Sequence, residues 1–229
     1  MFLNTLRATI FASLALSVTA FAQPNTTVDS PFQVRYASNL NVGDSVVNIT
    51  NSGARGAGLA AGTSASTTGA ICVNVYAFSP DEQMISCCSC PVTPNGLVSL
   101  SARQDLISNT LTPAVPTSII IKLLASTPQG GSCSSSAANP LGANALPRDF
   151  PTGMLAWGTT VHAGAAAGSA AVVTETAFST ATLSGVENPF LGIGELDRLR
   201  SLCNFINANG SGFGICRTCR LGGLGAGRL

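Results

Sequence analysis

The chain is poor in charged side chains. Only 9% of its 229 residues are charged, and Lys122 is the single lysine. The basic residues form no cluster and nearly balance the acidic ones, for a formal net charge of +1. Nucleic acid and anionic membrane surfaces both call for clustered Lys and Arg, so we expect neither as a partner. A nearly neutral chain rich in Ser, Thr, Asn, Gly and Ala favours self-association instead.

Catalytic motifs are missing as well. His162 is the single histidine, and its alternation with Val161 is typical of a surface-facing or hydrogen-bonded strand residue. The sequence contains no G-x-S-x-G elbow, no H-E-x-x-H pair and no D-x-[DN]-x-[DN]-G calcium loop. Its carboxylates are scattered singly, apart from Asp81 and Glu82, whose context is that of a turn. We therefore expect a non-enzymatic protein with no catalytic residue, cofactor or metal.

Long apolar runs are absent after the first 22 residues. No later run approaches the roughly 18 residues that a membrane-spanning helix needs, so we expect no membrane span. The first 22 residues have the order of a secretory signal peptide: Arg7, an apolar stretch over 8–19, and the exit Ala20-Phe21-Ala22. The sequence thus predicts a signal peptide over 1–22, a mobile leader over 23–30, and a protein that is secreted, periplasmic or extracellular.

Short strands bounded by turn residues dominate the middle of the chain. Phe32, Val34 and Tyr36 alternate with Gln33 and Arg35, which predicts a half-buried strand. Further strand patterns lie at 46–49, 70–90, 97–102, 118–125, 154–163 and 171–178. Seven or eight strands of this kind predict a mainly β protein with an antiparallel β-sandwich over residues 31–185. A long loop over 127–153 interrupts it.

The segment 70–90 carries the clearest hairpin signal. Two strand patterns flank Ser79-Pro80-Asp81-Glu82, where proline at the second position favours a type I turn. The strand over 97–102 is then expected to continue the same sheet as a meander. The apolar run over 118–125 is typical of a central strand buried on both faces.

The last part of the chain, 186–229, changes period. Leu196, Leu199, Cys203 and Ile206 recur at helical spacing, which predicts one amphipathic helix over about 194–208. Its leucine face is expected to lie on the sheet or on a partner. A Gly-rich tail with two cysteines follows.

Eight cysteines in an exported chain predict a disulfide framework. Five precede the helix and three lie in the helix and tail: Cys72, Cys87, Cys88, Cys90, Cys133, Cys203, Cys216 and Cys219. Because five and three are both odd, full pairing requires at least one bridge between the two regions. The hairpin favours Cys72 with Cys88 or Cys90, and proximity favours Cys203 with Cys216 or Cys219.

The same cysteines have a second interpretation as metal ligands. The patterns Cys87-Cys88-x-Cys90 and Cys216-x-x-Cys219 place thiolates at spacings that suit a soft ion, so a thiolate metal-binding protein is one alternative function. The strong form of such a motif repeats the Cys-x-x-Cys pair or adds histidines, and the chain does neither.

The favoured interpretation is a disulfide-stabilised structural, adhesive or surface-interaction protein without enzymatic activity. It would associate with itself or with a cell-surface protein or glycan, through a sheet edge or the Leu196–Ile206 helix face. The first alternative is a secreted polysaccharide hydrolase, which needs two carboxyl groups close together beside Trp157. Trp157, Tyr36 and Tyr76 are otherwise explained by packing.

Three N-x-[ST] sequons, at Asn25, Asn48 and Asn209, are glycan acceptors in a host that glycosylates exported proteins.

Overall fold

The strand patterns fold into nine strands that pair into two antiparallel sheets. The computed structural model describes residues 30–56, 69–128, 133, 150–164, 170–183, 194–212 and 214–220. The predicted signal peptide, most of the leader and much of the 127–153 loop lie outside these residues. The strands are β1 (Phe32–Ala37), β2 (Val46–Asn51), β3 (Ile71–Phe78), β4 (Met84–Val92), β5 (Leu97–Ser101), β6 (Ile119–Ser126), β7 (Met154–His162), β8 (Val172–Ala177) and β9 (Ser179–Thr180).

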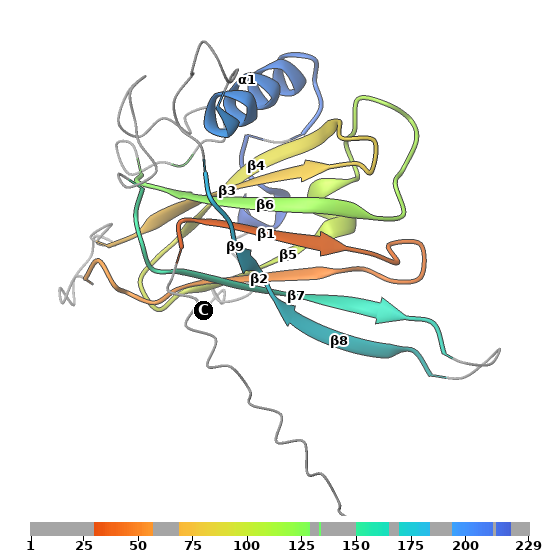
Figure 1. Ribbon diagram of the computed structural model, residues 1–229, viewed down its shortest axis with the longest axis horizontal. Coiled ribbons are helices and arrows are strands. Elements are labelled where there is room, and N and C mark those ends of the chain that lie inside the picture. The colour runs from red at the N-terminus through yellow and green to blue at the C-terminus, as the bar shows by residue number, and fades with distance from the viewer. Residues whose placement is uncertain are drawn as a thin grey trace, which may run out of the picture.

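One sheet has five strands in the order β4-β3-β6-β1-β9, and the other has four in the order β5-β2-β7-β8. The predicted mainly β sandwich is confirmed (Figure 1). Two hairpins, β3–β4 and β7–β8, join neighbours within a sheet, whereas the other connections pass between the sheets. Every pairing is antiparallel.

The β3–β4 hairpin agrees with its sequence signal, but the meander does not. The backbone N–H of Glu82 donates to the carbonyl of Ser79 at 3.0 Å, which closes the predicted turn. The expectation that 97–102 continues this sheet is wrong, because β5 pairs with β2 in the four-stranded sheet. A tight turn over Thr93–Gly96, with Asn95 at φ 60°, redirects the chain across the sandwich.

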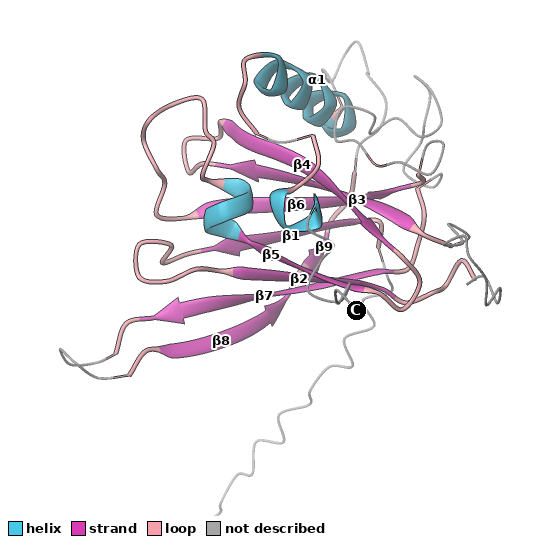
Figure 2. Ribbon diagram, turned by 180° about the vertical axis from the view of Figure 1, so that it is seen from behind, coloured by secondary structure: helices cyan, strands magenta, loops and turns pink. Residues whose placement is uncertain are grey.

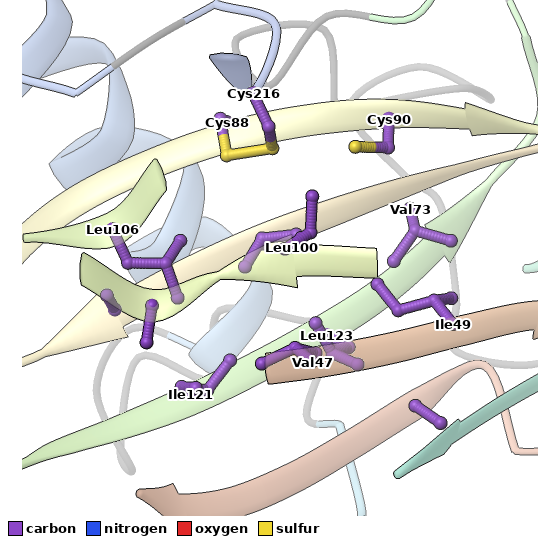
Figure 3. Packing of buried hydrophobic residues seen from close by; sticks show 14 of the residues in the cluster. Val47, Ile49, Val73, Cys88, Cys90, Leu100, Leu106, Ile121, Leu123 and Cys216 are labelled. Atoms are coloured by element: carbon purple, nitrogen blue, oxygen red, sulfur yellow. A yellow bond between two sulfur atoms is a disulfide. The ribbon is translucent and has the colours of Figure 1, made fainter. Parts of the chain in front are cut away.

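The main core lies between the sheets (Figure 3). Apolar side chains on alternating positions of β3 and β6, such as Val73 and Leu123, meet Val47, Ile49 and Leu100 from the four-stranded sheet. All five are fully buried. Removing such side chains from water is the main favourable contribution to folding, at about 25 cal/mol for each Å² of apolar surface.

The outer face of the five-stranded sheet has a second core, beneath α1 (Glu195–Ala208) (Figure 1). The predicted helix and its leucine face are both confirmed, since Leu196, Leu199, Cys203 and Ile206 are buried there. They pack with residues that include Tyr76 and Phe78 of β3. The leucine face of the helix is therefore covered by the sheet of the same chain. It is not available as a contact surface for a partner, which the sequence pattern allowed.

Strand β1 has the predicted alternation, but its polar side chains rather than its apolar ones face the four-stranded sheet, while Phe32 is buried in the second core. Gln33 and Arg35 are 3% and 6% exposed, whereas Tyr36 is 60% exposed. The polar side chains point toward the four-stranded sheet, where Gln33 donates to the carbonyl of Met154 at 2.8 Å. Buried polar groups with hydrogen-bond partners cost little, so partners on β7 and β8 allow the inversion.

The C-terminal segment covers the free edge of β4. After α1, the backbone N–H of Ser89 donates to Gly214 O at 3.2 Å, and that of Cys216 donates to Ser89 O at 3.1 Å. Ile215 thus forms an isolated parallel bridge with Ser89. A short helix, α2 (Arg217–Arg220), follows on the β5 side, beside the single π-helical turn η1 (Ala102–Leu106) (Figure 2). The sequence pattern indicates neither the bridge nor α2, because a Gly-rich tail has no periodicity.

Candidate functional site

All eight cysteines form disulfides, and strand register decides their direction. Cys87 pairs with Tyr76 and faces α1, whereas its neighbour Cys88 pairs with Val75 and faces the inter-sheet core. Adjacent positions of a strand point to opposite faces, so β4 carries cross-links on both sides. The bonds are Cys72–Cys133, Cys87–Cys203, Cys88–Cys216 and Cys90–Cys219.

Three of these bonds join β4 to α1 or to the C-terminal segment that follows it, which confirms the requirement for at least one bridge between the two regions. The specific pairings expected from the sequence are wrong. Cys72 stands opposite Pro91 on β4 and bonds Cys133, while Cys90 points to the inner core. Cys203 bonds across to β4, because α1 lies on the outer face and Cys216 on the inner one.

The cysteines of the two proposed metal patterns do come together. The Sγ atoms of Cys90, Cys216 and Cys219 lie within 4.8 Å of one another, and Cys88 Sγ is bonded to Cys216 Sγ. Cys88, Cys90 and Cys216 are completely buried, and Cys219 is partly buried. Cys87, which completes the first pattern, lies on the opposite face of β4.

His162 is a hydrogen-bonded strand residue, as predicted. It ends β7, and its Nε2 lies 3.0 Å from Oγ1 of Thr174 on β8. The contact therefore links the two strands of the hairpin.

Several of the described carboxylates bind parts of the chain itself. Asp105 is fully buried; its oxygens accept from the backbone N–H of Ser101 at 2.9 Å and of Thr218 at 2.8 Å. Glu195 pairs with Lys122. Asp81 accepts from the Ser79 hydroxyl within the predicted turn.

Trp157 lies on β7 and is partly exposed. A pocket of about 200 Å³ beside it is lined by Gln33, Leu155, Ala156, Ala177, Phe178 and Thr180. Among these described lining residues none is acidic, so the pocket does not bring together the two carboxyl groups that the hydrolase interpretation requires. Of the other aromatic candidates, Tyr76 is fully buried and Tyr36 is exposed.

The sequons occupy different environments. Asn48 lies within β2, where its Oδ1 accepts from the Ser99 hydroxyl at 2.6 Å. Asn209 is exposed at the end of α1. Asn25 lies outside the described residues.

Arg35 is a buried cation that the sequence pattern places on the solvent side of its strand. Nε donates to Thr176 Oγ1 at 3.0 Å, Nη2 to Thr160 Oγ1 at 2.7 Å and Nη1 to Ser45 Oγ at 3.2 Å. Burial lowers the pKa of the guanidinium from its ordinary value. Gly158 leaves room for this group, because a Cβ there would lie 2.7 Å from Arg35 Nη1. The alternating threonines of β7 and β8 are the signal that could have indicated these acceptors.

Strand β8 is the most open element in the described part of the fold. All six of its residues are exposed, including Val172 and Val173, each at 58%. One edge pairs with β7 from His162 to Trp157, and the other edge is the outer edge of the four-stranded sheet. Figure 1 shows the β7–β8 hairpin at the side of the sandwich away from α1.

No protein family, curated protein or solved structure matches this chain. None of the helices in the described ranges has the length and apolar character needed to cross a membrane.

Proposed function

We propose that this chain is an exported, non-enzymatic structural protein that associates with a second copy of itself through the free edge of β8. The observation that carries the proposal is the complete exposure of this edge strand. An edge strand presents unpaired backbone N–H and C=O groups, which makes it a template for another strand. The signal-peptide pattern and the four disulfides support export.

The other described edges are either covered or shorter than β8. The C-terminal segment pairs with β4 at Ser89, α2 packs beside β5, and β9 has only two residues. Proteins blunt exposed edges with short strands, covering segments, proline or lysine. Within the described residues no segment covers β8, and its sequence VVTETA has no proline or lysine and one charged residue, Glu175. The exposure of β8 therefore contrasts with the other described edges, which are covered or short.

The edge is held in place before any partner arrives. Six residue pairs join β8 to β7, and Arg35 of β1 donates to Thr176 across the sandwich. A strand that is already ordered loses little conformational entropy on binding, which favours association.

A second copy fits this edge because antiparallel strand pairing is two-fold symmetric, so one edge strand complements itself. Glu175 is the only charged residue of β8, and repulsion between carboxylates disfavours the register that places Glu175 opposite its copy. Registers centred on Val173 or Thr174 avoid this clash. The near-zero net charge of the chain adds no long-range repulsion between copies.

Concentration-dependent light scattering and sedimentation of the purified protein test the proposal. We expect a reversible monomer–dimer equilibrium. Val173→Glu places a carboxylate opposite Glu175 of the other copy in the register centred on Thr174, and opposite its own copy in the register centred on Val173. It should raise the dimer dissociation constant at least about 10-fold, which corresponds to about 1.4 kcal/mol.

Val115→Glu is the matched control, because Val115 is 65% exposed but lies in the segment between η1 and β6. It should leave the dissociation constant unchanged, and circular dichroism should show both variants folded. A protein that stays monomeric at every concentration would overturn the proposal. An equal response of the two variants would overturn the assignment to β8.

A further inference from the structure

Four sulfur atoms of the inner core form one cluster. Cys88 and Cys90 occupy alternate positions of β4 and so point to the same face. Cys216 and Cys219 are one helical turn apart, and the backbone N–H of Cys219 donates to Cys216 O at 3.0 Å. Strand and turn thus present a Cys-x-Cys pair and a Cys-x-x-Cys pair to each other. Figure 3 shows Cys90 beside the Cys88–Cys216 bond.

The cluster is positioned by contacts that involve no sulfur–sulfur bond. The segment that carries Cys216 pairs with Ser89 through two backbone hydrogen bonds. Asp105 accepts from the backbone N–H of Thr218 at 2.8 Å and from its hydroxyl at 2.5 Å. These contacts hold the segment against β4 and η1. The same contacts can form again in the reduced chain when a metal ion draws the four cysteines together.

We propose that the reduced form of this cluster is a zinc site, with Cys88, Cys90, Cys216 and Cys219 as its four ligands. A tetrahedral ion with Zn–S bonds of about 2.3 Å separates its sulfurs by roughly 3.8 Å. The Sγ atoms of Cys90, Cys216 and Cys219 already lie within 4.8 Å of one another. Thiolates are soft ligands that select Zn²⁺ over Mg²⁺ or Ca²⁺.

The chemistry requires a thiol or phosphine reductant. With a thiol, each of the two disulfides takes up two electrons and two protons from two reductant thiols, which leave joined as a disulfide. Four cysteine thiols result. Zinc binding then releases their four protons and forms four Zn–S bonds. In the oxidised protein two disulfides cross-link β4 to the C-terminal segment, and in the reduced protein one ion makes the same connection.

The other two disulfides provide a contrast within the molecule. Cys87–Cys203 lies on the outer face beneath α1, and Cys72 bonds Cys133. Among the described residues, only the inner cluster brings three or more potential ligand atoms of His, Cys, Asp or Glu this close. Zinc uptake should therefore be confined to one site.

The test uses the full-length protein, reduced with a phosphine under anaerobic conditions and then freed of reductant. Titration with Co²⁺ should give the absorption of a tetrahedral tetrathiolate site, complete at one equivalent and displaced by one equivalent of Zn²⁺. Bound Zn²⁺ should also protect Cys88, Cys90, Cys216 and Cys219 from alkylation, with the other four cysteines modified.

Two double variants separate this site from general thiol binding. Cys90→Ser/Cys219→Ser removes two ligands and should weaken zinc binding by more than the roughly 10–100-fold that loss of an outer-shell partner costs. Cys87→Ser/Cys203→Ser also lacks one disulfide but keeps all four ligands, and its affinity should match that of the parent.

Three results would overturn the proposal: no stoichiometric metal uptake by the reduced parent, equal loss in both variants, or protection of a different set of cysteines. A reduced chain that has unfolded and stays unfolded when Zn²⁺ is added would also overturn the proposal, as a failure of metal uptake. The reason is that a four-thiolate site couples metal binding to folding. The proposed dimer does not depend on this site, because β8 contains no cysteine.

Discussion

The two sides of the sandwich are held together by different means. On the side of β4, three disulfides join one strand to α1 and to the C-terminal segment, and this segment covers the strand edge. On the side of β7 and β8, neither strand contains a cysteine, and Arg35 links the sheets through hydroxyl groups. The strand edge on the disulfide-bonded side is covered, and the strand edge on the hydrogen-bonded side is free. We call these the closed side and the open side. The free edge therefore lies where the structure depends on side-chain packing and hydrogen bonds.

The three disulfides on the closed side overlap along the chain. Each joins residues 116 to 129 positions apart, but Cys203 lies only 13 positions before Cys216, and Cys219 only three after it. Once Cys88–Cys216 has formed, each of the other two closes a short loop. In the chain-entropy account a loop of about 100 residues contributes about 4.7 kcal/mol, one of about 15 residues about 3, and one of about five residues about 2.

The largest effect is expected from removing all three disulfides of β4 by serine substitution of both partners in each. The summed loss is about 10 kcal/mol, comparable to the whole stability of a typical domain of about 5–15 kcal/mol. We expect the C-terminal segment to detach and cooperative unfolding to disappear, as followed by circular dichroism during urea titration. The control Cys72→Ser/Cys133→Ser should lose about 4 kcal/mol and still unfold cooperatively. A folded triple variant would show that the closed side does not depend on sulfur.

Single removals should have much smaller effects. Cys87→Ser/Cys203→Ser should lower the free energy of unfolding by about 3 kcal/mol, and Cys90→Ser/Cys219→Ser by about 2, because the remaining bridges keep the loops short. Urea titration of each protein gives these values. Losses near 5 kcal/mol in each single variant would contradict this account of short residual loops.

The sequence is sufficient to predict the elements but not the partners of their side chains. Alternation locates β1, and helical spacing locates α1, because both periods follow from backbone geometry alone. The orientation of β1 depends on Thr160 and Thr176, which lie more than 120 positions away. No local pattern in β1 contains this information.

The disulfides illustrate the same limit. The odd number of cysteines in each region is enough to predict a bridge between the two regions, with no knowledge of the fold. The pairing itself depends on which face of β4 each cysteine occupies, and a β-bulge near Phe78 shifts that register. It also depends on the position of residues 214–216 along the edge of β4, for which the Gly-rich tail has no periodic signal. The sequence motifs therefore identify the cysteines of the sulfur cluster, but they do not show that these cysteines meet in the fold.

The open side can be tested at Gly158. Gly158→Ala would place a Cβ 2.7 Å from Nη1 and 2.9 Å from Cζ of Arg35 and would displace the guanidinium from Thr160 and Thr176. We expect a loss of about 1–3 kcal/mol in the free energy of unfolding. In an Arg35→Ala background the same substitution should cost less, because the clash is gone. Equal costs in both backgrounds would mean that Arg35 does not tie β1 to β7 and β8.

The smallest effect concerns Tyr76, on the closed side beneath α1. Its ring is fully buried, and its hydroxyl makes no hydrogen bond with any described residue. A buried polar group without a partner costs free energy, so Tyr76→Phe should stabilise the protein by about 1 kcal/mol at pH 7. Tyr36→Phe is the control, since that ring is 60% exposed, and it should change nothing.

The pH dependence of Tyr76 gives a second measurement of the same hydroxyl. Burial raises the pKa of this phenol, while the charge of Arg200 opposes the shift. Below about pH 10 the phenol is neutral in both states, whereas at higher pH the unfolded chain loses the proton and the folded one retains it. The stability of the parent should therefore fall above about pH 10 by up to about 1.4 kcal/mol per pH unit relative to Tyr76→Phe. Urea titrations at pH 9 and pH 11 measure this difference. If Tyr76→Phe were instead destabilising at pH 7, the hydroxyl would have a partner, and the closed side would rely on polar bonding as the open side does.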